Sequence, residues 1–197
     1  ALVYHFTSRG SRFNKFAGGD TGKDSPEWKR TNSRNERNFI RKWGSNVQHD
    51  STMLPIVSPK YDIGFVVHSC TDELLYLLEP WCSTIFCDFN GNPSESIDDY
   101  IETESSNTKI NLKEKVYDSN TERALSSDDN HPIGLDINND IIVIFDGSKL
   151  NASNSQFIGK LPLIIQDSGT VGDMKYDIFE LKIKRIKDYS KELINAV

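Results

Sequence analysis

The chain has 197 residues, with 23 Lys and Arg against 29 Asp and Glu and a net charge of −6. Hydrophobic residues make up 37% of it, which is enough to bury a core in one or two globular domains. A transmembrane helix needs about 18 consecutive apolar residues, and no such run occurs. The opening apolar stretch, residues 2–6, is too short for a signal peptide. We therefore expect a protein without a membrane partner, located in the cytoplasm, or in the host cytoplasm if the chain is viral.

The charge is divided unevenly along the chain. Residues 1–60 hold 11 basic and 5 acidic side chains, whereas the other 137 residues hold 12 basic and 24 acidic ones. Such an asymmetry indicates a basic face for phosphates, a segment that lies against a neighbour, or a solvated surface.

Residues 1–58 predict an irregular, basic segment with one helix. Arg, Asn, Ser and Gly are frequent, and residues 17–26 have the composition of a loop. We expect the helix at residues 33–43, because Phe39, Ile40 and Trp43 would share its inward side and Gly44 would end it. Residues 47–60 contain two prolines and predict a linker.

Residues 60–197 predict an acidic α/β domain, a small mixed sheet with helices. The run at 141–146 is continuously apolar, which indicates a central strand. Residues 176–186 alternate between apolar and polar, which indicates a strand with one wet face. Residues 119–139 have the composition of a long polar loop. We expect strands at 63–70, 83–89, 111–117, 141–146 and 176–186, and helices at 72–78, 97–104, 154–166 and 189–197.

Nucleophilic catalysis has one weak candidate in the sequence. His68 and Cys70 lie two residues apart in a predicted strand, so their side chains would point to the same face. A Cys–His pair needs an exposed thiolate, whereas this strand is apolar and favours a histidine satisfied within the core. Cys70, Cys82 and Cys87 lack the spacing of a zinc site, and we expect buried, reduced thiols.

Two separated stretches of the basic segment carry a resemblance to a known family. Residues 4–13 read Tyr-His-Phe-Thr-Ser-Arg-Gly-Ser-Arg-Phe, and residues 35–44 read Asn-Glu-Arg-Asn-Phe-Ile-Arg-Lys-Trp-Gly. Together they resemble the C-terminal part of family 2-like glycosyltransferases of the GT-A fold, which often finish with a His-Phe-x-Ser element and a helix bearing Asn, Phe and Lys-Trp-Gly. The acidic domain is similar to accessory domains that follow such enzymes in phage and environmental sequences.

The resemblance implies a metal-assisted transfer from a nucleotide sugar to a glycan or protein acceptor. A divalent ion, Mn or Mg, would bridge the diphosphate of the donor, with His5 as one metal ligand. Ser8, Arg9 and Arg12 would bind the substrates. The nucleotide-binding strands, the Asp-x-Asp motif and the catalytic base would all precede His5, so we assign no catalytic residue in this chain. We expect the C-terminal portion of a glycosyltransferase that is inactive without a separate catalytic core.

Two alternatives stay open. In the first, the chain is a non-enzymatic module whose acidic domain binds a protein partner and whose basic segment is an adaptor. In the second, basic side chains between Lys29 and Lys42 contact the phosphates of a nucleic acid. The second alternative is the weaker one, because Phe39 and Trp43, which could stack on bases, are expected on the buried side of the helix.

Overall fold

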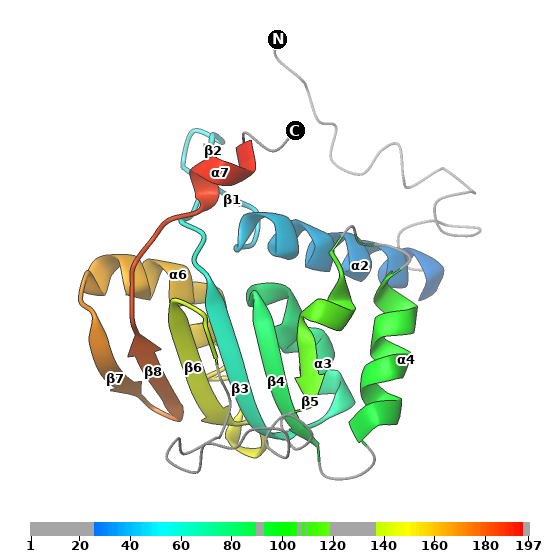
Figure 1. Ribbon diagram of the computed structural model, residues 1–197. Coiled ribbons are helices and arrows are strands. Elements are labelled where there is room, and N and C mark those ends of the chain that lie inside the picture. Colours follow the sequence, from blue (N-terminus) through cyan, green and yellow to red (C-terminus); the bar gives the residue numbers. More distant parts are fainter. Residues whose placement is uncertain (1–25, 90–92, 106–107, 109, 119–136, 195–197) are drawn as a thin grey trace. The chain divides into compact units, whose positions relative to one another are not determined.

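The computed structural model describes residues 26–89, 93–105, 108, 110–118 and 137–194. The chain divides into two compact units, residues 1–38 and residues 39–197, and the boundary falls inside helix α2 (Pro26–Trp43). The second unit is a mixed sheet with helices (Figure 1), so the predicted α/β class is confirmed. No helix within the described ranges is both long and apolar enough to cross a membrane.

Helix α2 begins at Pro26 rather than at residue 33. Proline suits the first turn of a helix, where its missing N–H has no intrahelical partner, and Glu27 complements the positive end of the helix dipole. The apolar periodicity starts later in the helix, so it did not predict a start at Pro26. The helix ends as predicted at Gly44, which has a φ of 72° and donates its N–H to the carbonyl of Ile40 at 2.7 Å.

The six-stranded sheet has the order β5-β4-β3-β6-β8-β7. Strands β5, β4, β3 and β6 are parallel, and β8 runs antiparallel to both of its neighbours. The chain places β4 and β5 on one side of β3 and β6 on the other, so the strand order reverses at β3. The strands are β3 (Ile63–Cys70), β4 (Thr84–Phe89), β5 (Val116–Asp118), β6 (Ile141–Asp146), β7 (Gly172–Tyr176) and β8 (Phe179–Ile183).

Three helices pack on one face of the sheet and bury the main core, and Figure 1 shows α3 and α6 behind the strands. Leu75 of α3, Tyr100 of α4 and Leu161 of α6 join Phe65 and Val143 of the strands in one apolar cluster. Each fully buried Leu or Phe side chain stabilises the fold by about 1.5–3 kcal/mol. Apart from α2, the helices and short 3-10 turns are α3 (Asp72–Leu78), α4 (Pro93–Ser105), α6 (Gln156–Ser168), α7 (Ser190–Ile194), η2 (Glu79–Trp81), η3 (Leu112–Glu114) and η4 (Gly147–Lys149).

The opposite face of the sheet carries a smaller apolar cluster. Val66, Phe86 and Ile142 are buried there together with Ile137. The ring of Phe86 stacks on that of Tyr117, with centroids 5.0 Å apart. Successive strand residues alternate between the two faces, so each parallel strand contributes to both clusters.

The C-terminal part of the sheet differs from the expectation of one strand at 176–186. A hairpin forms instead, and it turns through Asp177, which has a φ of 52°. The side chains of β7 are all exposed, so this edge strand shows no alternation that would reveal it. Strand β8 has the predicted wet face, because Phe179 and Leu181 are buried while Glu180 is exposed.

Two further segments depart from the expected elements. The expected strand at 111–117 forms η3 first, and strand β5 follows it. The expected linker contains a short antiparallel ribbon of β1 (Gln48–His49) and β2 (Pro55–Ile56). Cys70, Cys82 and Cys87 are free and buried, as predicted.

A buried ionic cluster joins the end of α2 to the sheet domain. The carboxylate of Glu79, which is 0% exposed, accepts hydrogen bonds from Arg41 Nη2 at 2.6 Å and from the Tyr100 hydroxyl at 2.6 Å. Lys115 forms an ion pair with its other oxygen, and Arg41 also pairs with Glu104 at 2.9 Å. Arg41 lies within the basic stretch that the nucleic-acid alternative would need exposed, and its burial removes it from any such surface.

Burial alone would raise the pKa of Glu79, but the positive charge of Lys115 and the hydrogen bonds and charge of Arg41 outweigh it. The pKa of Glu79 therefore lies below its ordinary value, and the carboxylate stays ionised in the core at neutral pH.

Arg41→Ala should lower the free energy of unfolding by about 3–5 kcal/mol, because it leaves two buried carboxylates with too little positive charge. Urea denaturation followed by circular dichroism measures this loss. The matched control is Arg30→Ala on the same helix, since Arg30 pairs with Glu27 on the surface, where both side chains are 70% exposed. The control should change stability by no more than about 0.5 kcal/mol. Equal effects of the two variants would contradict the central role of the cluster.

Candidate functional site

His68 lies between two carboxylates at the carboxyl ends of three neighbouring parallel strands. Its Nδ1 is 3.7 Å from Oδ2 of Asp88 on β4, and His68 is paired in register with Asp146 on β6. The side chains of His68 and Asp88 are 37% and 32% exposed. Open α/β sheets bind ligands outside the carboxyl ends of the strands where the strand order reverses, and β3 is that place here. The row of Asp88, His68 and Asp146 is therefore the candidate functional site, and we call it the carboxyl-edge site.

The backbone at the end of β3 has an unusual conformation. Ser69 has a φ of 53°, in the left-handed region that non-glycine residues rarely adopt, and the pairing with β4 shifts between Val67 and Cys70. Because of this bulge, Cys70 joins the buried core while the neighbouring His68 stays partly exposed. The expectation that His68 and Cys70 share one face was wrong, and so was the expectation of a core histidine.

Gly147, directly after β6, lies close to the backbone at the end of β3. A Cβ atom at this position would lie 3.1 Å from the carbonyl oxygen of Ser69, 3.2 Å from that of His68 and 2.7 Å from Leu74. A larger residue would require these atoms to shift, so glycine favours the close approach of the turn after β6 to the end of β3. Strained backbone that neighbouring residues hold in place is a feature of functional sites, which supports a role for this edge.

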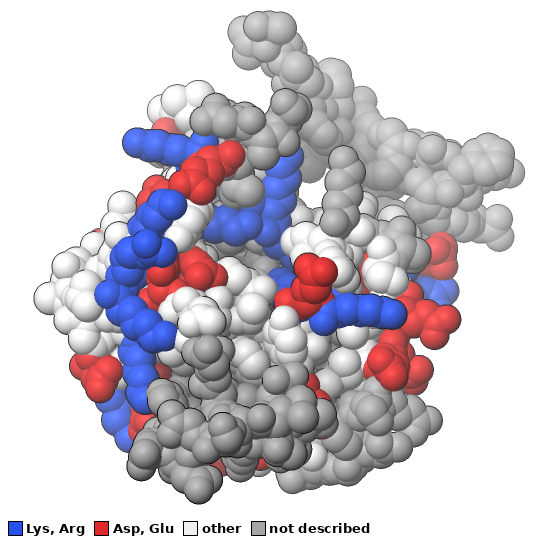
Figure 2. All heavy atoms as spheres, in the orientation of Figure 1, with Lys and Arg blue, Asp and Glu red and all other residues white. Residues whose placement is uncertain are grey.

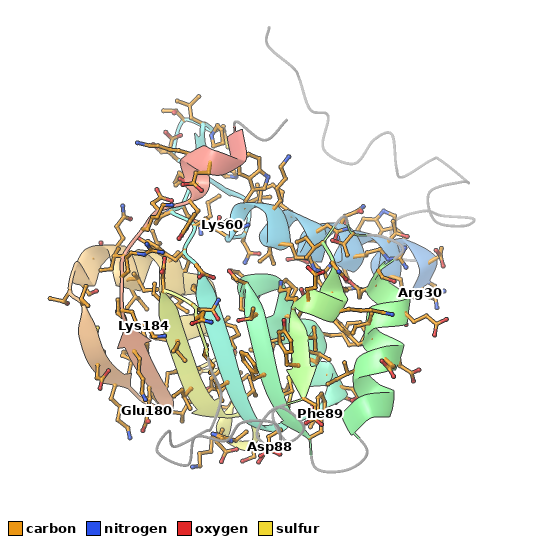
Figure 3. The ribbon with its side chains drawn as sticks, viewed as in Figure 1. Arg30, Lys60, Asp88, Phe89, Glu180 and Lys184 are labelled. Atoms are coloured by element: carbon orange, nitrogen blue, oxygen red, sulfur yellow. The ribbon has the colours of Figure 1, made fainter. Side chains whose placement is uncertain are left out.

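A cavity of about 370 Å³ opens beside the row. His68 and Asp146 line it together with Lys149 from η4 and Lys175, Asp177 and Glu180 from the hairpin. Lys175 pairs with Glu180 at 3.0 Å, and Lys149 lies 3.4 Å from Asp146. Figure 3 shows Asp88 and Glu180 along the same edge of the sheet. Carboxylates outnumber ammonium groups in the lining, so a phosphate would be repelled, whereas hydroxyl groups would find both donors and acceptors.

Two carboxylates of this cavity, Asp146 and Glu180, have pKa values below the ordinary range. The hydroxyl of Ser148 donates to Asp146 at 2.7 Å and lowers the pKa of Asp146. The hydrogen bond and charge of Lys175 lower the pKa of Glu180. Imidazole is the side chain suited to exchange protons near neutral pH, so His68 is the group of this row that could act as an acid or a base.

The buried thiols are poor nucleophiles. Burial raises the pKa of Cys82 to about 12. A hydrogen bond with Cys70, followed by burial, raises the pKa of Cys87. A nucleophilic cysteine needs a lowered pKa and access to solvent, so neither thiol suits that role.

Figure 2 shows basic side chains in a column over β8 and the segment that follows it. Most of these groups interact within the chain. Arg185 pairs with Asp140 at 2.7 Å, Lys187 pairs with Glu192 at 3.0 Å, and Lys184 donates to the carbonyl of Ile137. The column is therefore largely neutralised, which weakens it as a site for nucleic-acid phosphates.

The substrate and metal residues that the resemblance implies, His5, Ser8, Arg9 and Arg12, lie outside the described residues. Within the described part of the chain, no group of three or more His, Cys, Asp or Glu side chains could hold a metal ion. Asp88 and Asp146 were not singled out from the sequence as site residues. One signal pointed to them, because each stands at the carboxyl end of a predicted strand, but only the strand order shows that they flank His68.

Comparison with family models, with curated proteins and with solved structures gives no significant match for this chain. Its class therefore follows from its own fold and site. The second unit is an α/β domain whose strand order reverses at β3 and which carries a polar, partly strained site at that point.

Gly147→Ala should destabilise the chain by about 1–3 kcal/mol, because the added methyl group forces two backbone carbonyls and the partly buried Leu74 to shift. The matched control is Gly159→Ala in α6, where the nearest atom would be 3.4 Å away and alanine favours the helix by about 0.5–1 kcal/mol. Thermal and urea denaturation of both variants test this. A Gly147→Ala variant as stable as the control would show that the approach to β3 is not tight.

Proposed function

We propose that the chain is the C-terminal portion of a glycosyltransferase, which moves a sugar from a nucleotide-sugar donor to a glycan or protein acceptor and needs a catalytic core outside this chain. The proposal starts from the resemblance of residues 4–13 and 35–44 to family 2-like glycosyltransferases. The second stretch forms the end of helix α2 and is closed by Gly44. A helix is the form that the resemblance implies for it, which supports the proposal.

One observation links the short glycosyltransferase-like stretch to the α/β domain. Arg41 belongs to the glycosyltransferase-like stretch, and its guanidinium is buried against Glu79 and Glu104 of the α/β domain. A plain linker between two independent domains would not place a buried charge in the second one. Residues 39–44 of the stretch thus belong to the same unit as the α/β domain, so the domain would serve the sugar transfer.

In this proposal, the donor and the acceptor bind to parts of the protein that carry opposite charge. The excess of carboxylates in the carboxyl-edge cavity disfavours a diphosphate. The donor would bind to the basic segment and the catalytic core, with Mn or Mg held in part by His5 and with Ser8, Arg9 and Arg12 beside it. The carboxyl-edge site would receive an acceptor hydroxyl, and His68 could take up its proton.

Calorimetric titration with uridine diphosphate and Mn²⁺ tests the donor half of the proposal. We expect His5→Ala to weaken binding by about tenfold or more, since loss of even an outer-shell partner weakens metal binding by about 10–100-fold. The control is His49→Ala, because His49 is an exposed histidine of β1. Binding that His5→Ala leaves unchanged, or that His49→Ala weakens to the same extent, would count against the proposal. An Asp-x-Asp motif encoded upstream of Ala1 would strengthen it.

A second candidate function is that of a protein-interaction module, and one surface favours it. Large apolar side chains on and around the β1–β2 ribbon are 46–71% exposed. Exposed apolar side chains do not stabilise a solvated ribbon, and a group of them is typical of an interaction surface. They are Val47, Met53, Leu54, Ile56 and Val57.

This surface gives a test that separates the two functions. Leu54→Asp should leave the fold intact, because Leu54 is 62% exposed, but should abolish association with a protein partner recovered from the source cells. Size-exclusion chromatography of the purified pair measures the loss. The control is Leu163→Asp on α6, which is also exposed and lies outside the ribbon. If the partner proves to be the catalytic core, the ribbon serves the first proposal; if Leu54→Asp and the control behave alike, the ribbon is no interface.

A further inference from the structure

A second cavity, separate from the carboxyl-edge site, lies against Trp81. It has a volume of about 380 Å³, within the range of about 300–1,000 Å³ that small-molecule sites occupy. Its lining comes from the segment before β1, from the end of α3 and η2, and from the start of α6, and it shares no residue with the carboxyl-edge cavity. The lining residues are Asn46, Gln48, Leu77, Trp81, Ser155, Gln156, Ile158, Gly159 and Lys160.

The aromatic wall of this cleft is fixed by its neighbours. Trp81 is half-buried and packs against the main core, so its indole has little freedom to move. Gly159 of α6 lies beside the ring, and a Cβ there would make an ordinary van der Waals contact with the indole at 3.4 Å. The exposed part of the indole is therefore a preorganised apolar surface. A ligand that binds to it would cause little further loss of side-chain entropy.

The polar groups of the cleft are mostly neutral. Asn46, Gln48 and Gln156 bring three primary amides, and none of their side chains hydrogen-bonds to another residue that the structure describes. An amide offers both donors and an acceptor, as a hydroxyl group does. Lys160 is the one charged residue among the lining residues, and no carboxylate accompanies it.

From this combination we infer that the Trp81 cleft binds a neutral carbohydrate chain. A sugar ring has an apolar C–H face that can lie on an indole, and hydroxyl groups at its edge that match side-chain amides. A nucleotide or a nucleic-acid strand would need more than one cation, and a proline-rich peptide would need a longer row of aromatic rings. The inference extends the proposed function, on which it rests only for the identity of the sugar chain as the acceptor.

Nuclear magnetic resonance of the full chain tests the inference directly. The three indole N–H signals, from Trp28, Trp43 and Trp81, are assigned with single Trp→Phe variants and followed during titration with cellohexaose, maltohexaose and chitohexaose. We expect at least one of these neutral oligosaccharides to move the Trp81 signal in a saturable way. Gln48→Ala and Gln156→Ala should each weaken that binding about fivefold, the equivalent of one lost hydrogen bond.

The matched control is Gln166→Ala, which removes an exposed amide from the same helix outside the cleft and should leave the affinity unchanged. Both glutamines of the cleft lie at its surface, so their variants should fold, and thermal denaturation checks this. The inference fails if none of the oligosaccharides moves the Trp81 signal up to its solubility limit, or if adenosine monophosphate or decaproline moves it instead. It also fails if the cleft variants bind as the control does. Oligosaccharide binding without donor binding would keep this inference and overturn the proposed function.

Discussion

The carboxylate of Glu79 is the constraint on which the domain depends. A buried charge costs several kcal/mol to desolvate, and the fold offsets this cost only by bringing Arg41 and Lys115 to the same point. Arg41 comes from the end of α2 and Lys115 from the residue before β5, while Tyr100 of α4 donates to the same carboxylate. Three segments distant in sequence, the end of α2, α4 and the start of β5, are thereby fixed relative to η2. A purely apolar contact would tolerate sliding, whereas these charge-assisted hydrogen bonds have one geometry.

The sequence predicted the elements best where a local pattern decides them. Strand β6 was expected at its observed bounds because a run of continuously apolar residues can only be buried. Strand β7 was missed because every one of its side chains is exposed and only its hydrogen bonds to β8 make it a strand. The burial of Arg41 was not predicted, for a related reason. An arginine on a helix looks like a surface residue until its buried carboxylate partners, far away in sequence, are known.

The carboxyl-edge site shows the same limit for function. Asp88, His68 and Asp146 stand on three strands, and nothing in their spacing along the chain relates them. Their meeting follows from the parallel order of β4, β3 and β6 and from the bulge at Ser69, which separates His68 from the core. Strand order and backbone strain are properties of the folded chain. A periodicity argument could therefore place the strand but not the direction of its last side chains.

These contacts explain part of the uneven distribution of charge along the chain. Two of the basic groups within residues 1–60 serve the fold: Arg41 neutralises buried carboxylates, and Lys60 Nζ donates to the carbonyl of Arg41 at 2.7 Å at the end of α2. The remaining basic excess belongs mostly to residues 1–38, whereas the carboxyl-edge cavity is acidic. A departing diphosphate needs positive charge, and an acceptor hydroxyl needs a base and hydrogen-bonding groups. Under the proposed function, the basic segment would therefore face the donor, and the domain with the acidic cavity would face the acceptor.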